Sequence, residues 1–198
     1  MPGPTLEQLL DEVAAATASP GGGACCGWAA ALAAALIEMA AGVAEARGVD
    51  AAARDAGVDA GGADIDGPAR MARIRLRAND LRRQATELAE RDRDSYGPVL
   101  AAQRSGDAAA VQWALQRASD TPFALTAVAA ELAVLAQEML AAGRPSLEGD
   151  AVTALELARA SCRAAANLVM LNLKSLPADP RRKAVQALLE RAGGTASA

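Results

Sequence analysis

Side chains suited to proton chemistry are few in this chain, and they sit among apolar residues. The chain has no histidine, so the commonest general base and the commonest metal ligand are both missing. Acid–base chemistry would therefore fall to carboxylates, lysine, cysteine or Tyr96. Three cysteines, two of them adjacent, form neither a disulfide framework nor the spacing of a metal site. We therefore expect no metal cofactor.

Asp92 and Asn172 each occupy a position on the apolar face of an expected helix, where an apolar residue would be typical. The series before Asp92 recurs at spacings of four and three, typical of a helix seam in a bundle. A polar residue on such a seam either belongs to a site or has a structural partner. For Asp92 that partner would be a neighbouring arginine, and for Asn172 a hydrogen bond across the bundle. The seam before Asp92 consists of Ile74, Ala78, Leu81, Ala85 and Leu88.

A run of three glycines, Gly21, Gly22 and Gly23, directly precedes the most apolar stretch of the chain. Glycine loses the most backbone entropy on folding, so three in a row need a reason. Exposed backbone N–H groups at a helix start suit a carboxylate or a ring carbonyl of a ligand. The alternative is an ordinary turn that lets two helices cross closely.

Three further residues in the apolar stretch have open roles. Glu38 is the only charged residue between Ala24 and Val43. Because a buried unpaired carboxylate is costly, Glu38 faces solvent, an interface or a salt bridge, or else it lines a cavity. Cys25 and Cys26 are either small core residues or thiols at a helix N-terminus, where the thiolate is favoured.

The composition predicts that helices position these groups. Hydrophobic residues make up 52% of the 198 residues but aromatics only 2%, so the core consists of alanine, leucine and valine. Alanine and leucine are strong helix formers, which predicts a single all-α domain over residues 1–198. Thr5, Asp107, Thr121 and Asp179 are the expected N-caps. The expected helices cover about 5–17, 24–47, 69–96, a short segment after Asp107, 122–143, 149–176 and a last segment after Asp179.

Around this core, of about residues 5–176, the sequence predicts two irregular segments. Residues 48–68 are rich in glycine, aspartate and alanine and are expected to form a flexible loop, while 193–198 form a frayed tail. The apolar stretch from Ala24 to Ile37 is shorter than the roughly 20 residues of a membrane span. The net charge of −4, with arginines spread among acids, indicates no nucleic-acid surface. We expect a cytoplasmic protein without membrane or nucleic-acid partners.

Five segments in this order resemble the cyclodeaminase/cyclohydrolase family. That family comprises the C-terminal domain of formiminotransferase-cyclodeaminase and stand-alone bacterial methenyltetrahydrofolate cyclohydrolase relatives. The resemblance spans Leu6 to Leu176. Its motifs are Pro-Gly-Gly-Gly at 20–23, an Asp-x-x-Ala-Phe-like element at 92–96, a helix-opening Pro122, a Gly-Asn-x-Asn-x-x-Ser-Asp-like segment at 143–150 and an Asn-Val-x-Ile-Asn-Leu-like segment at 168–173.

The resemblance implies a bundle of six to seven helices, paired as a two-fold homodimer, that acts on a tetrahydrofolate derivative. One family reaction, of the lyase type, closes 5-formiminotetrahydrofolate to 5,10-methenyltetrahydrofolate with loss of ammonia. The other, a hydrolase reaction, converts methenyltetrahydrofolate to 10-formyltetrahydrofolate. Both pass through a tetrahedral carbon between nitrogens, which needs a proton shuttle and a negative field but no metal. The sequence does not choose between them.

The resemblance also implies roles for seven residues. Asp150 and Asp92 are the expected catalytic carboxylates, one moving the proton and the other holding the heterocycle. Arg144 stands where the family has asparagine and is expected to contact an anionic part of the substrate. Gly21, Gly22, Gly23 and Asn172 are expected to bind substrate. We expect these residues to converge on one pocket, within one chain or with the partner subunit.

Several polar positions of the family pattern are replaced, and two other functions follow from that. Arg144, Ser146, Gly149 and Leu168 stand where the family has asparagine or serine. These changes favour an enzyme of the same fold repurposed for a non-folate substrate in specialised biosynthesis. A non-catalytic helical dimer is the third alternative. Carboxylates retained at Asp92 and Asp150 argue against that alternative, because a scaffold has little need for them.

Overall fold

The computed structural model describes residues 5–55, 67–142 and 145–193, and over these ranges the chain is helical without any strand. The predicted all-α bundle is confirmed. Seven of the helices correspond to predicted ones, and α4 is an additional short helix. The elements are α1 (Leu6–Ala14), α2 (Gly22–Asp55), α3 (Gly67–Ser95), α4 (Gly97–Ser105), α5 (Ala108–Ala118), α6 (Asp120–Ala141), the 3₁₀ turn η1 (Pro145–Leu147), α7 (Glu148–Asn172) and α8 (Pro180–Arg191).

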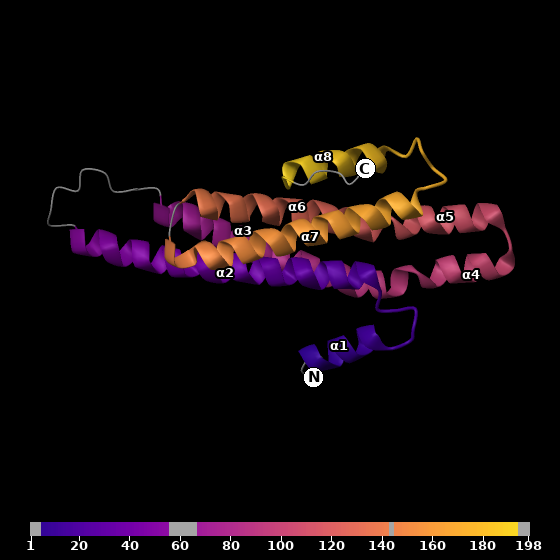
Figure 1. The fold of residues 1–198 in the computed structure, drawn as a ribbon, viewed down its shortest axis with the longest axis horizontal. Helices are drawn as coiled ribbons and strands as arrows, with labels where there is room; N and C mark the ends of the chain where they lie inside the picture. Colours follow the sequence, from indigo (N-terminus) through magenta and orange to yellow (C-terminus); the bar gives the residue numbers. More distant parts are fainter. Residues whose placement is uncertain (1–4, 56–66, 143–144, 194–198) are drawn as a thin grey trace.

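Four long helices, α2, α3, α6 and α7, lie side by side and form an elongated bundle (Figure 1). Successive long helices run in opposite directions along it. Helices α4 and α5 extend the bundle at the end where α2 begins and α3 ends. Helix α8 packs on one side, and α1 lies on the opposite side (Figure 1), where Glu12 pairs with Arg93 of α3.

The core is built from small side chains, so the helix backbones come close together. A Cβ added at Gly27 in α2 would lie 2.6 Å from the Ala89 Cβ and 2.9 Å from the Ala85 carbonyl oxygen in α3. Gly27 is therefore required for the crossing of α2 and α3. Larger side chains such as Ile37 and Leu132 are fully buried between the helices.

Two predicted boundaries are corrected by the structure. Helix α2 begins at Gly22 and continues through Asp55, so residues 48–55 are helical rather than part of a loop. Alanines at 51–53 favour this continuation. Residues 56–66 of the predicted loop, and 194–198 of the predicted tail, lie outside the described residues. At the other end, the core extends beyond residue 176, because α8 buries Val185 and Leu189 against the bundle.

Local caps set several helix starts. Thr5 and Gln8 form a reciprocal capping box at α1, Asp107 accepts from two N–H groups of α5, and Asp179 accepts from the Arg181 N–H at α8. These three caps are confirmed. Thr121, expected as a cap, instead lies inside α6, because that helix already begins at Asp120.

Two stretches, Gly22–Arg47 and Ala108–Ala141, are long and apolar enough to cross a membrane by length and composition. The first is longer than the apolar run from Ala24 to Ile37 noted in the sequence. It stays apolar on average although it includes a polar residue such as Glu38. In the most apolar 18 residues of each stretch, about half is buried inside the bundle (50% and 56%). That burial is typical of core helices, which bury one face against neighbours.

Candidate functional site

A cavity of about 460 Å³ opens at the end of the bundle where α2 begins. The first turn of α2, the last turn of α3, the start of α6 and the end of α7 surround it. Five of the seven predicted site residues line this cavity: Gly21, Gly22, Gly23, Asp92 and Asn172. The remaining lining is mostly apolar and includes Ser95, Tyr96, Leu115, Pro122, Leu168 and Leu171.

The carboxylate of Asp92 sits over the first turn of α2. It accepts a hydrogen bond from the backbone N–H of Ala24. The Ser95 hydroxyl is 3.5 Å from its Oδ1 and donates at 2.8 Å to the Asp92 carbonyl oxygen. Asp92 thus caps α2 from a different helix. A helix N-terminus favours a negative group through its free N–H groups and its dipole.

Gly23 makes this position of Asp92 available. A Cβ at residue 23 would lie 2.2 Å from the Asp92 Oδ1, well inside contact distance. Nothing lies within 4 Å of a Cβ added at Gly22, and at Gly21 the nearest atom is the Ala18 carbonyl oxygen at 3.8 Å. The glycine run therefore has two parts. Gly23 admits the Asp92 carboxylate, whereas Gly22 presents open backbone.

Burial raises the pKa of Asp92 above its ordinary value, although the hydrogen bonds from Ala24 and Ser95 act in the opposite direction. A half-buried carboxyl with a raised pKa, in a cavity, is typical of a group that exchanges protons with a ligand.

Asn172 and Tyr96 complete the polar part of the cavity wall. Asn172 Nδ2 donates to the Ala118 carbonyl oxygen at 3.3 Å and so joins the end of α7 to the end of α5. Tyr96, just before α4, is 41% exposed and lines the cavity. Ser95 is not among the site residues predicted from the sequence, and Tyr96 is named there only as one of the groups able to do acid–base chemistry. The signal was present, because both belong to the 92–96 motif.

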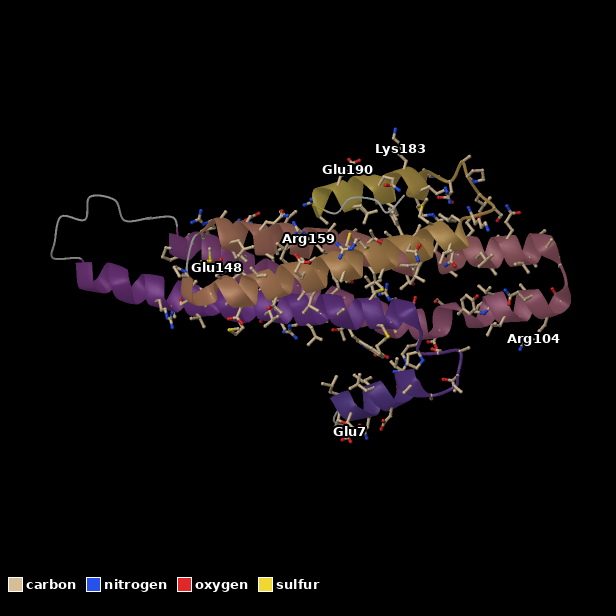
Figure 2. The ribbon with its side chains drawn as sticks, viewed as in Figure 1. Glu7, Arg104, Glu148, Arg159, Lys183 and Glu190 are labelled. Atoms are coloured by element: carbon tan, nitrogen blue, oxygen red, sulfur yellow. The ribbon has the colours of Figure 1, made fainter. Side chains whose placement is uncertain are left out.

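A single chain does not bring Asp150 to this cavity. Asp150 lies in the first turn of α7 and Asn172 in its last. At a rise of 1.5 Å per residue, they are separated by about 33 Å along the helix. Figure 2 shows Glu148, at the start of α7, and Arg104, on α4 beyond the cavity, toward opposite ends of the bundle. Arg144, the seventh predicted site residue, lies outside the described residues.

The structure also settles the surroundings of Glu38. Its carboxylate accepts hydrogen bonds from Asn79 Nδ2 at 2.8 Å and Arg82 Nε at 2.9 Å. Partial burial acts to raise its pKa, but these bonds outweigh it and hold the pKa below its ordinary value. Of the sequence alternatives, the salt bridge is observed, and Glu38 also lines an open groove between α2 and α3.

Two of the three cysteines are core residues, and Cys25 is partly exposed. Cys26 and Cys162 are buried, and burial raises the pKa of each thiol to about 11. Burial, followed by the nearby charge of Asp92, raises the pKa of Cys25 as well. A favoured thiolate at the start of α2 is therefore not what the structure shows. Among the described residues, no group of three or more His, Cys, Asp or Glu is placed to hold a metal ion.

Residues 5–191 match the formiminotransferase-cyclodeaminase family. The chain belongs to this family. The match confirms the resemblance carried by the sequence motifs and extends it through α8.

Two relatives illustrate the similarity. The chain is 27% identical to a methenyltetrahydrofolate cyclohydrolase from Methylorubrum extorquens over 96% of this chain and 90% of that protein. It also superimposes on the crystal structure of a formiminotetrahydrofolate cyclodeaminase from Thermotoga maritima. The TM-score is 0.76 with 26% identity, over 96% of this chain and 88% of that one.

Proposed function

We propose that the protein is a one-carbon folate enzyme that acts as a cyclodeaminase or as a methenyltetrahydrofolate cyclohydrolase. Family membership and the names of both relatives support the folate substrate. The observation that carries the proposal is Asp92, a half-buried carboxyl of raised pKa in a cavity of about 460 Å³. That volume lies within the range of about 300–1,000 Å³ typical of small-molecule sites.

Asp92 would move the proton that either reaction requires. In the hydrolase reaction, water adds to the methenyl carbon, and Asp92 accepts the proton that this water loses. The tetrahedral intermediate then breaks one carbon–nitrogen bond, and Asp92 returns the proton to the departing nitrogen. In the lyase reaction, a folate nitrogen attacks the formimino carbon, and the proton goes to the departing ammonia. The negative carboxylate also stabilises the cationic amidinium.

The other cavity residues would bind and orient the heterocycle. The backbone near Gly21 and Gly22 is open to a ligand, and the Asn172 amide offers both a donor and an acceptor. The Tyr96 ring lines the same cavity and can stack on a flat ring system. Gly23 would contribute indirectly by admitting Asp92.

We further propose a cytoplasmic homodimer that needs no metal. Asp150 remains a catalytic candidate in this proposal, but it would have to reach the cavity from the partner subunit. Arg144 would contact an anionic part of the folate. Activity that survives prolonged treatment with chelators is the expected result for a reaction without metal.

The decisive test is turnover of the two folates. Loss of the methenyl absorbance band reports hydrolysis of methenyltetrahydrofolate, and its appearance reports conversion of formiminotetrahydrofolate. Asp92→Asn should lower kcat by about 10²–10⁴-fold, because it keeps the shape but removes the base. Asp94→Asn, an exposed change two residues along the same helix, should match wild type. If wild type converts neither compound, the folate assignment fails. If Asp92→Asn matches wild type, the role of Asp92 fails.

A further inference from the structure

Two adjacent arginines, Arg181 and Arg182, lie in the first turn of α8, outside the four-helix bundle. Helix α8 runs back along the bundle from the end where α7 finishes (Figure 1). Each arginine side chain reaches the end of a different helix, one in α5 and the other in α7. Both of these helix ends form part of the wall of the candidate site. The pair therefore links a helix on the side of the bundle to the cavity.

Arg181 holds the junction between α5 and α6. Its Nη1 donates to the Gln116 carbonyl oxygen at 3.0 Å and to Asp120 Oδ1 at 2.6 Å. Its Nε and Nη2 donate to the two carboxylate oxygens of Asp179 at 2.9 Å and 2.7 Å. This paired contact fixes the plane of the guanidinium, because two parallel hydrogen bonds allow only one orientation. With that plane fixed, Nη1 is held at the end of α5 and the start of α6.

Arg182 holds the end of α7. Its Nη1 donates to the Leu173 carbonyl oxygen at 3.2 Å and lies 3.4 Å from the Met170 carbonyl oxygen. Leu173 is the C-cap residue of α7 and has no exposed surface. A positive group is favoured at a helix C-terminus, because the last carbonyl groups lack partners within the helix and the dipole is negative there. Arg182 thus anchors the turn that carries Asn172.

The two anchored helix ends form much of the apolar side of the cavity. Asn172 Nδ2 also donates to the Ala118 carbonyl oxygen at 3.3 Å, so the ends of α5 and α7 are joined to each other as well. Helices α5, α7 and α8 are therefore connected pairwise, by Arg181, Arg182 and Asn172. The lining residues on the anchored helix ends are Leu115, Ala118, Leu168, Leu171 and Asn172.

The proton side of the cavity is positioned by other contacts. Asp92 lies near the end of α3 and accepts from the Ala24 N–H in the first turn of α2. Helix α8 packs against α6 and α7. The side chains of Arg181 and Arg182 bond to α5, to α6, to α7 and to the cap of α8 itself. The arginine pair therefore acts on the wall that would bind a ring system rather than on the carboxylate that would move the proton.

We propose that Arg181 and Arg182 are positioning residues of the site, each fixing one helix end against which the substrate's ring system packs. The identity of that ring system, a reduced folate, rests on the proposed function. A flat heterocycle is held well only when the spacing of the walls matches its thickness, and a misplacement of about 1 Å can cost about 10²-fold in rate. Both arginines act through backbone carbonyl groups of the helices that they hold, so neither needs to contact the substrate.

The first test is steady-state kinetics on whichever of the two folates the wild type converts, well below the Tm of every variant. Arg181→Gln and Arg182→Gln should each raise KM by about 10–100-fold, because the binding wall is displaced. They should leave kcat within about threefold of wild type and the acidic limb of its pH profile in place, because Asp92 keeps its contacts. A purely structural role would instead reduce the fraction of folded enzyme, which lowers the apparent kcat and leaves KM unchanged.

Lys183→Gln is the matched control. It removes the same charge from the next residue of α8, whose side chain points away from the bundle (Figure 2). Its KM should equal that of wild type. Unchanged KM in either arginine-to-glutamine variant would overturn the role of that arginine, and an equal rise in Lys183→Gln would overturn both.

A second control separates geometry from charge. Arg181→Lys keeps the charge but loses the paired contact with Asp179, so its KM should rise as in Arg181→Gln. A wild-type KM in Arg181→Lys would overturn the paired geometry as the means by which the wall is held.

The second test is the coupling between Arg182 and Asn172. Asn172→Leu removes the link between α5 and α7, and Arg182→Gln removes the link between α7 and α8. Because both links hold the same turn, the double variant should raise KM by clearly less than the product of the two single effects. A rise equal to the full product would show that the two residues act independently and overturn the shared wall.

The third test needs no substrate. Hydrogen exchange should become faster at the end of α5 in Arg181→Gln and at the end of α7 in Arg182→Gln, while Lys183→Gln should exchange as wild type does. The last turn of α3, which carries Asp92, should keep its wild-type exchange in all three variants. Unchanged exchange at both helix ends would overturn the proposal. If wild type converts neither folate, the proposed function fails, while hydrogen exchange still decides whether the arginines hold the cavity wall.

Discussion

Gly23→Ala should both destabilise the protein and remove its activity, although it adds a single methyl group. The new Cβ would lie 2.2 Å from Oδ1 and 2.3 Å from Cγ of Asp92. The carboxylate cannot stay where it is, and on leaving it loses the backbone N–H of Ala24. One change therefore removes a helix cap and displaces the proposed proton carrier.

The expected loss of stability follows from three opposing contributions. Losing a cap costs about 0.5–2 kcal/mol, and forcing a methyl group into a packed site costs about 1–3 kcal/mol. Replacing glycine by alanine in a helix returns about 0.4–1 kcal/mol. The net destabilisation should be about 1–4 kcal/mol, which for a chain of this size lowers Tm by about 2–4 °C per kcal/mol. The fall in kcat should approach that of Asp92→Asn.

Gly22→Ala is the matched control. Its Cβ would meet nothing within 4 Å, so the substitution should raise the unfolding free energy by about 0.4–1 kcal/mol. If a folate packs against this backbone, KM should rise while kcat holds. Gly22→Ala thus separates the conformational effect of alanine from the clash with Asp92.

The assay is urea unfolding followed by circular dichroism, combined with a double-mutant cycle. In an Asp92→Ala background the clash is gone, so Gly23→Ala should become neutral or stabilising. The coupling between the two positions should exceed about 1 kcal/mol. Additive effects of the two substitutions would refute the reasoning. So would a Gly23→Ala protein as active as wild type.

Four other predictions follow from the structure. Because burial raises the pKa of Asp92, the stability of wild type relative to Asp92→Asn should be greatest below pH 3.8 and decline as pH rises through the raised pKa, measured by urea unfolding across that range. The Arg181 guanidinium holds the pKa of Asp179 well below its usual range, so the contribution of Asp179 should be present above its ordinary pKa and be lost as pH falls, an effect that Asp179→Asn should abolish. Arg181→Ala should lower the unfolding free energy by about 1–2 kcal/mol in urea melts, because it breaks hydrogen bonds to Asp179, Asp120 and the Gln116 carbonyl oxygen. Asn172→Leu should raise KM for the folate substrate more than it lowers kcat in steady-state kinetics, because the residue lines the cavity and would bind rather than react.

Sequence patterns predict the helices well where the signal is local and periodic. The α3 seam from Ile74 to Leu88 repeats with the helical period, and caps such as Thr5 and Asp107 act within three residues of themselves. The extension of α2 to Asp55 was missed, because glycine and aspartate at 48–50 suggest a turn. In the structure the helix continues through them into the alanines.

The site was predictable only in part. Asp92 could be found because it interrupts an apolar seam. Its contact with Gly23 joins residues far apart in the sequence, so no local pattern encodes it. In the same way, the sequence motif predicts that Asp150 lies at the start of a helix. It does not predict at which end of the bundle that helix starts. Only the direction of the packed helices separates it from Asp92 within one chain.

The alanine-rich core also determines what absorbance and fluorescence spectroscopy can report about this protein. Its absorbance near 280 nm comes from Trp28, Trp113 and Tyr96, and none of these side chains is buried. Trp28 is partly exposed on α2, Trp113 is exposed on α5, and Tyr96 lines the cavity. Intrinsic fluorescence will therefore report little about the interior of the bundle. Without any label, it will instead report events at the molecular surface, among them the arrival of a substrate at the cavity that Tyr96 lines.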